Sequence, residues 1–327
     1  MQKIILISIL ILIEVCSFFP ESKGYINEII VITSPEDKSL VEPFLLDVFT
    51  EIIHTPQPEQ SFILKYYNPW ELESLEENAN IIIASLDFPI DSTGDILMDR
   101  LLDRHKQDAN LLTLGDLYAK NQLLCLIHAL DAVAFNKILK ENRDWILEEY
   151  HALFSKRLKQ EVFKNGNNPD LSSEIFYILG YTIDLQLDFK LIRSDSLSSF
   201  AWVGRGYPYR WITLHKSRKV GYANIDSSWN QLNEDFSMHM PKLKISKFFR
   251  KNEITSIGSK KIPVMRGIYE HSESDTGGPF FVYIFDTDRT NEVILVSGFI
   301  NFPGHEKLLL LRQLEIMAKT LHKGDPA

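Results

Sequence analysis

The spacing of apolar residues differs between the two halves of the chain, and the spacing in the first half predicts strands separated by helices. Continuous apolar runs at 28–33, 80–86 and 122–129 are typical of strands that are covered on both faces. A further strand is predicted over 62–67, and apolar residues at helical spacing predict a helix over 39–53. Strands that alternate with helices predict a layered α/β domain.

The longest predicted element is a helix over residues 132–163, whose apolar side chains keep to one stripe. Asp131 is placed to cap its first turn. The run Asn165-Gly166-Asn167-Asn168-Pro169 then ends the helix and is interpreted as a domain boundary. The predicted domains are residues 25–166 and residues 170–323.

Short aromatic strands are typical of the second half of the chain. They are predicted at 200–203, 209–215, 264–269, 280–285 and 293–300. The polar turn at 286–291 predicts a hairpin between the last two, and an apolar stripe over 308–321 predicts a closing helix. The fold class is therefore predicted as α/β and α+β, with the layered α/β domain followed by an antiparallel-sheet α+β domain that has a C-terminal helix.

The segment 1–24 has the pattern of an export signal. Lys3 precedes an apolar run from Ile4 to Ile13, and Gly24 ends a small-residue cleavage site. The run is shorter than the roughly 20 residues that a membrane span needs. We therefore predict that this signal peptide is removed and that the mature protein is exported to the periplasm or envelope.

The charge of the chain limits its partners. The 327 residues carry a formal net charge of −9 and no long basic run. Nucleic acid binding needs clustered Lys and Arg, and so does docking on anionic lipid headgroups, so neither partner is expected. Cys125 lies in an apolar run and is expected to be a buried thiol without a nucleophilic role.

No established catalytic or cofactor motif appears in the sequence, so no catalytic residue, metal or cofactor is assigned. Glu270, His271, Glu273 and Asp275 form a cluster, but their spacing matches no known set of metal ligands, and we interpret it as a solvated turn. The turn at 286–291 begins like a calcium loop but lacks the required Gly and Glu.

The most distinctive stretch runs from Arg266 to Glu270 and on to the Gly277-Gly278 pair. Adjacent glycines permit a close approach of the backbone, and Arg266 can pair with Glu270, with Glu315 or with a ligand anion. Any function is predicted to lie on a surface formed by Arg266, Glu270, Gly277, Gly278, Trp202, Arg205 and Arg210.

Several of these motifs occur together in a known family. The chain resembles the bacterial family catalogued as domain of unknown function 4837, whose members are mostly exported lipoproteins. The resemblance covers nearly the whole chain after the signal and is strongest over 266–270, 277–280 and 311–315. It implies a lipid on an N-terminal cysteine, for which Cys16 is the candidate, although Val15 differs from the small residue usual before such a cysteine. It implies no activity.

Two functions remain open at this stage. The preferred one is a non-enzymatic envelope module, binding or structural, whose partner is an unknown protein or small molecule and whose only membrane attachment is the N-terminal lipid. The alternative is an enzyme, for example a hydrolase, with its active site between the two domains. Converging titratable side chains in a cleft would favour the enzyme, and an apolar or aromatic surface would favour the binding module.

Overall fold

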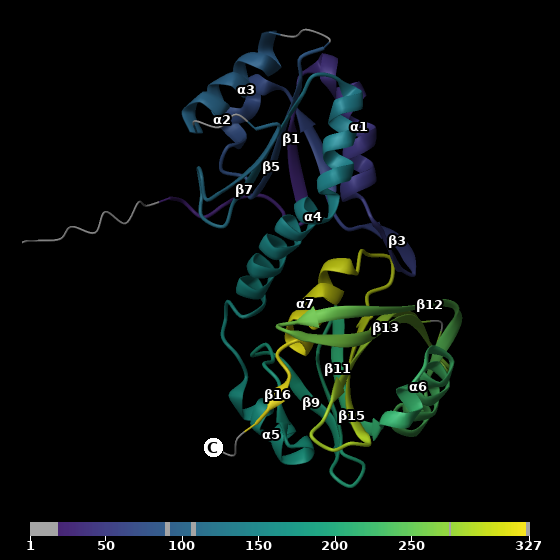
Figure 1. The fold of residues 1–327 in the computed structure, drawn as a ribbon. Coiled ribbons are helices and arrows are strands. Elements are labelled where there is room, and N and C mark those ends of the chain that lie inside the picture. The colour runs from purple at the N-terminus through teal and green to yellow at the C-terminus, as the bar shows by residue number, and fades with distance from the viewer. Residues whose placement is uncertain (1–18, 89–91, 106–108, 275, 325–327) are drawn as a thin grey trace, which may run out of the picture. The chain divides into compact units, whose positions relative to one another are not determined.

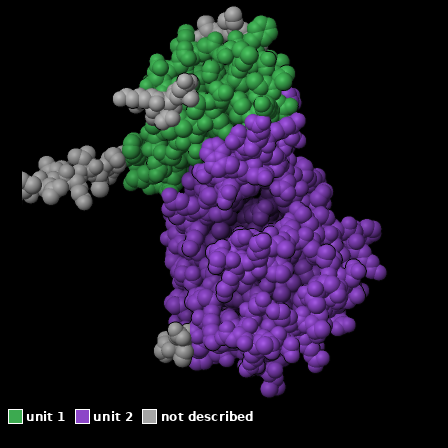
Figure 2. Space-filling view, viewed as in Figure 1, with its two compact units in different colours: residues 1–41, 65–138 green, residues 42–64, 139–327 purple. Residues whose placement is uncertain are grey.

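The computed structural model describes residues 19–88, 92–105, 109–274 and 276–324. The chain forms two compact units, coloured separately in Figure 2. Unit 1 comprises the chain up to residue 41 together with 65–138, and unit 2 comprises 42–64 and 139–327. The helices α1 (Pro35–Phe49) and α4 (Ala132–Val162) each contribute residues to both units. The two units are divided at other positions than the domain boundary that the sequence predicts near residue 166. That domain boundary stays a prediction.

Unit 1 is built on a mixed sheet with the order β4-β1-β5-β7-β6. Its strands are β1 (Glu28–Ile32), β4 (Ile63–Tyr67), β5 (Asn80–Leu86), β6 (Leu111–Gly115) and β7 (Leu123–Ala129). The strands β1, β5 and β7 are parallel, and β6 runs antiparallel to β7. All seven residues of β5 are buried, as its continuous apolar run predicts.

The helices α2 (Leu72–Leu75) and α3 (Ser92–His105) cover one face of this sheet (Figure 1). The short 3₁₀ helix η1 (Pro69–Glu71) precedes α2. Met98 and Leu101 of α3 pack against Ile83 and Leu126 of the sheet in one apolar cluster. Unit 1 therefore has its own core, as the predicted layered α/β domain requires.

Unit 2 is built on an antiparallel sheet of seven strands with the order β12-β13-β14-β15-β11-β10-β9. The strands are β9 (Lys190–Asp195), β10 (Phe200–Arg205), β11 (Tyr209–Arg218), β12 (Leu243–Ile257), β13 (Lys260–His271), β14 (Gly277–Asp286) and β15 (Glu292–Asn301). The predicted hairpin is confirmed as β14 and β15, and the predicted fold class is confirmed for the molecule.

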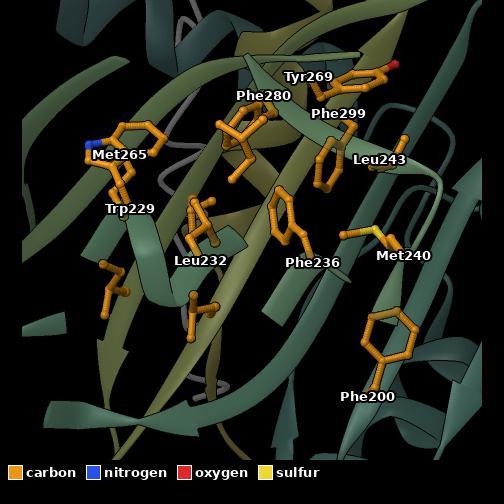
Figure 3. Close-up of a cluster of buried hydrophobic side chains, with 14 of the residues drawn as sticks. Phe200, Trp229, Leu232, Phe236, Met240, Leu243, Met265, Tyr269, Phe280 and Phe299 are labelled. Carbon is orange, nitrogen blue, oxygen red and sulfur yellow. The ribbon is translucent and has the colours of Figure 1, made fainter. Parts of the chain in front are cut away.

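One face of this sheet packs against α6 (Ile225–His239), which follows the 3₁₀ helix η2 (Lys219–Tyr222). Figure 3 shows the buried side chains between them, where Phe236 of α6 lies among aromatic rings of β14 and β15. Its ring centroid is 5.6 Å from that of Phe280 and 5.5 Å from that of Phe299. Neither α6 nor β12 was predicted from the sequence.

The other face packs against the closing helix α7 (Leu308–Ala318), which confirms the predicted terminal helix. The remaining elements are α5 (Pro169–Leu179), the paired strands β8 (Tyr181–Thr182) and β16 (His322–Lys323), and the hairpin of β2 (Ile52–Thr55) with β3 (Gln57–Gln60). The helix predicted over 39–53 ends at Phe49, and residues 52–60 form this hairpin. Asn168 accepts a hydrogen bond from the backbone of Leu171, so the predicted helix breaker also begins α5.

Across the described ranges, no helix combines the length and the apolar composition that crossing a bilayer requires.

Candidate functional site

The residues of the predicted binding surface lie on two opposite faces of the seven-stranded sheet. Arg266 and Arg210 bond to Glu315 and Gln313 of α7, whereas Trp202 packs against the core cluster on the α6 side. Side chains alternate between the faces of a strand, so these positions cannot meet at one site. The structure therefore brings together only part of the predicted set.

Two other members of the predicted set lie at the edges of these elements. Arg205 at the end of β10 pairs with Asp188, with 2.7 Å between Nη1 and Oδ2. Glu270 near the end of β13 is exposed, and its backbone pairs with Gly277. Neither side chain adds to the network around Arg266.

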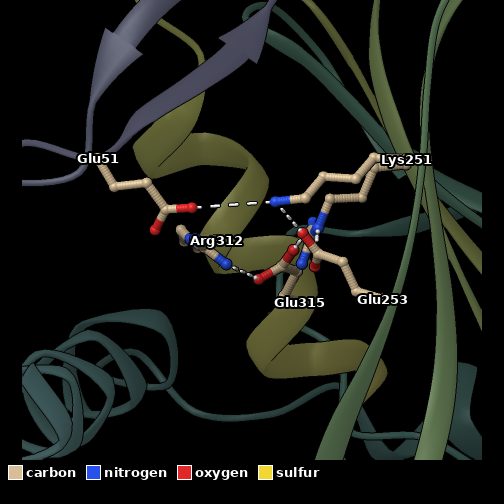
Figure 4. A network of polar contacts seen from close by, with 6 residues as sticks. Glu51, Lys251, Glu253, Arg312 and Glu315 are labelled. Atoms are coloured by element: carbon tan, nitrogen blue, oxygen red, sulfur yellow. Dashed lines mark hydrogen bonds and ion pairs between the residues drawn. The ribbon is translucent and has the colours of Figure 1, made fainter. Parts of the chain in front are cut away.

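Arg266 is the centre of a partly buried ion-pair network. Figure 4 labels four other members of it, Lys251, Glu253, Arg312 and Glu315. Its Nε lies 2.8 Å from Oε2 of Glu253, and its Nη1 bonds to Glu315. Arg312 reaches the second oxygen of Glu315 at 2.8 Å, and Lys251 reaches Glu253 at 2.6 Å. The network joins β12, β13 and α7, so of the two predicted partners Arg266 takes Glu315 and not Glu270.

The charge of Glu315 depends on this network. Burial on its own would raise the pKa of this carboxyl, but the guanidinium groups of Arg266 and Arg312 lower it to about 2. Glu315 is therefore ionised at neutral pH although it is buried. A carboxylate with two arginine partners holds the sheet and the helix together, and this is a structural role.

The Gly277-Gly278 pair allows three strands to pack closely. A Cβ on Gly278 would lie 1.9 Å from the carbonyl oxygen of Ile300, and one on Gly277 would lie 2.3 Å from that of Tyr269. No side chain fits at such distances, so the backbone approach that the sequence predicts serves strand pairing.

The acidic cluster after β13 is an exposed turn, with Glu273 paired to Lys242 at 2.6 Å. Asp275 lies outside the described residues. Within the described part of the chain, no three His, Cys, Asp or Glu side chains are arranged to hold a metal ion.

A cavity of about 370 Å³ opens beside the core on the α6 side of the sheet. Its walls include Trp202, Trp211, Met240, Leu243 and Tyr269, and we call it the tryptophan pocket. Figure 3 shows Tyr269, Leu243 and Met240 where they meet the core cluster. Strands β10, β11 and β13 and the segment after α6 build these walls, so the pocket combines residues that are far apart in the sequence.

The titratable side chains at the polar part of the pocket are mostly basic. Arg193, Lys242, His239 and His271 all line it, and no Asp or Glu is among the described lining residues. Burial, together with the nearby His215, lowers the pKa of His239 to about 4. His239 is therefore neutral at neutral pH, and its ring stacks on Phe200 with 4.5 Å between centroids.

Two hydrogen-bond donors in the pocket walls have no acceptor. The indole nitrogens of Trp202 and Trp211 are both buried and have no hydrogen-bond partner in the described part of the chain. An unsatisfied buried donor costs about 1–3 kcal/mol. Such groups are uncommon in folded proteins.

Behind His239 lies a group of polar side chains that do not line the pocket. Asp235 accepts a hydrogen bond from Tyr222 at 2.7 Å, and His215 Nε2 lies 3.4 Å from the same carboxylate. The ring of His215 is 5.1 Å from that of His239. His239 thus lies against the rings of both Phe200 and His215.

Of the pocket residues, sequence analysis had singled out only Trp202 as a site residue. Arg193, Trp211 and His239 lie on three different elements, and no motif connects them. The one signal available was the aromatic content of the strands at 200–203 and 209–215, where alternate residues share a face.

The two parts of the chain match two family models. Residues 172–320 match the family described as domain of unknown function 4837, and residues 22–163 match domain of unknown function 8532. Residues 172–320 thus belong to the domain of unknown function 4837 family. The predicted family is thus confirmed, although its model covers the C-terminal part of the chain only. No curated protein matches the chain.

Solved structures resemble the chain only distantly. A crystal structure from Bacteroides thetaiotaomicron VPI-5482 is 11% identical over 46% of this chain and 48% of its own length, with a TM-score of 0.28. The match thus spans about half of that protein. The Ran-binding protein Mog1p of Saccharomyces cerevisiae is 9% identical over 44% of this chain and 90% of its own length, with a TM-score of 0.33. Similarity at this level carries no conclusion about function.

Proposed function

We propose that unit 2 is a binding module whose tryptophan pocket holds a small organic ligand with an apolar body. The observation that carries this proposal is a cavity of about 370 Å³ with aromatic and aliphatic walls and a polar mouth. Ligand sites typically measure about 300–1,000 Å³ and combine mostly apolar walls with a few polar groups. The tryptophan pocket has both properties.

The composition of the pocket favours binding over catalysis. General acid–base chemistry needs groups that exchange protons near neutral pH, and nucleophilic chemistry needs an activated nucleophile. Neither Ser, Cys, Asp nor Glu is among the described residues that line the pocket. Of its two histidines, His239 has a pKa lowered to about 4, and His271 is the last residue of β13, next to an exposed turn. The binding module is therefore the better proposal than the hydrolase.

The place of action that we propose is the cell envelope. This rests on the signal pattern of residues 1–24, with attachment through a lipid on Cys16 or release after cleavage at Gly24. Cys16 lies outside the described residues.

Titration with a neutral apolar ligand tests the binding proposal. We expect 1-octanol to bind saturably, with heat released in calorimetry and a change in tryptophan fluorescence, since Trp202 and Trp211 line the pocket. Thr276→Trp should fill the cavity and remove this binding, because Thr276 lies in its lining.

The matched control is Thr255→Trp, which places the same side chain at a half-buried threonine of β12 that does not line the pocket. Circular dichroism of both variants checks that they fold. The proposal fails if the wild type does not bind 1-octanol saturably, or if Thr276→Trp and Thr255→Trp bind it equally well.

A further inference from the structure

We infer that the ligand of the tryptophan pocket is an amphipathic carboxylate, whose charged end is bound by Arg193 and whose apolar end lies against the walls. This inference rests on the proposed function and names the chemical class of the ligand. It follows from the charged residues and the apolar walls of the site.

The charged residues that line the pocket are basic, although the chain as a whole has a net charge of −9. In the described part of the chain these are Arg193 and Lys242, and His239 is not among them because its pKa is lowered to about 4. Lys242 contributes little, since it is paired with Glu273 at 2.6 Å and both side chains are 60% exposed.

Arg193 is the cation that remains for a ligand. In the described part of the chain its guanidinium has no carboxylate within 4.0 Å. Its Nη1 donates to the carbonyl oxygen of His239 at 3.2 Å, and its Cζ lies 5.8 Å from the ring centroid of Phe200. These contacts hold the planar group beside the pocket while most of its five N–H donors are unused.

A carboxylate matches this guanidinium better than other acceptors do. Its two oxygens accept a parallel pair of N–H bonds from one arginine, and such charge-assisted bonds are about twice as strong as neutral ones. A neutral hydroxyl offers a single oxygen without charge. The mouth of the pocket therefore discriminates between ligands by their polar end.

The walls of the pocket fit the apolar end of such a ligand. Leu243, Met240 and Tyr269 present mostly carbon to it. An apolar chain that ends in a carboxylate fits both parts of the site.

Octanoate and 1-octanol form a matched pair of probes, because they share an alkyl chain and differ in the polar end. At neutral pH, and below the concentration at which octanoate forms micelles, we expect calorimetry to show tighter binding of octanoate. Arg193→Gln should weaken octanoate binding about tenfold, which corresponds to about 1.4 kcal/mol, and should change 1-octanol binding less than about twofold. Added salt should weaken only octanoate.

Arg218→Gln is the control, because Arg218 is exposed at the end of β11 and does not line the pocket. Equal affinity of the wild type for both probes, or an Arg193→Gln variant that keeps full octanoate affinity, overturns this inference and leaves the proposed function intact. If neither probe binds, the proposed function itself fails.

Discussion

The role of Arg266 in this protein depends on the burial of its side chain. Its side chain is only 14% exposed, and it bonds to a glutamate whose side chain is 3% exposed. Surface ion pairs contribute about 0–1 kcal/mol, whereas removal of one partner from a buried pair costs about 3–5 kcal/mol, because the remaining charge stays buried without compensation. At an exposed site, the stretch around Arg266 would be available to ligands. In this structure it holds α7 to the sheet.

Arg266→Ala is therefore expected to lower the free energy of unfolding by about 3–5 kcal/mol, since Glu315 loses one of its two arginine partners. Urea denaturation followed by circular dichroism measures the change. Arg289→Ala provides the comparison, because Arg289 is 78% exposed and pairs with Glu292 at 3.6 Å, so its loss should cost about 1 kcal/mol or less. Similar costs for the two variants would contradict the buried network.

At the scale of elements, the centre of the antiparallel sheet depends on close contact between β13, β14 and β15. The glycines of β14 occupy positions where the neighbouring backbone leaves no room for a methyl group. Glycine weakens an isolated strand by its conformational freedom, so its use here indicates that the close approach outweighs that cost. Tyr269 of β13 lines the tryptophan pocket. The walls of the pocket therefore depend on how these strands pair.

Gly278→Ala should disturb the pairing of β14 with β15, because the new Cβ would lie 1.9 Å from the carbonyl oxygen of Ile300. We expect a loss of about 3 kcal/mol or more in the free energy of unfolding, together with weaker binding of 1-octanol. Gly206→Ala is the matched control, since nothing lies within 4 Å of a Cβ built there, and its stability should change by about 0.5 kcal/mol or less. Thermal unfolding measures the change in stability, and calorimetry measures the binding of 1-octanol. If the two variants behave alike, this account of the sheet is refuted.

On the scale of the whole molecule, the chain builds two separate sheets, each with its own buried side chains. The N-terminal sheet has parallel central strands, which need cover on both faces, and the C-terminal sheet is antiparallel throughout its length. Cys125 lies within β7 of the first sheet and is fully buried. Its thiol can therefore report whether unit 1 is folded.

Burial raises the pKa of the Cys125 thiol to about 12, so almost no thiolate is present at neutral pH. In a Cys16→Ser background we expect Ellman's reagent to leave the native protein unmodified and to react with one thiol per chain once urea unfolds it. Cys125→Ser in the same background should give no reaction in either condition. Rapid stoichiometric reaction of the native protein would contradict the burial of β7.

Several elements could be predicted because their signals are local. Continuous apolar runs such as 80–86 identified buried strands, the stripe over 132–163 identified the long helix, and Asp131 does cap it, as its carboxylate accepts from the backbone of Val133 and Ala134. Strand β12 escaped prediction because it is an edge strand with mostly exposed residues, and its register with β13 shifts between Ile245 and Arg250. A mixed polar pattern of this kind resembles a loop.

Short-range periodicity thus predicted many of the elements and the fold class of this protein, because the burial of a strand or helix is reflected in the spacing of its own apolar residues. The family was indicated separately, by the resemblance of motifs such as 266–270 and 277–280. Only the tertiary structure decided which residues meet. Arg266 could pair with Glu270 or with Glu315 as far as the sequence shows, and the packing of α7 on the sheet selected Glu315, 49 positions away. Arg193, Trp211 and His239 likewise share a pocket because strand order and the placement of α6 bring three distant segments together, and no local pattern encodes that order.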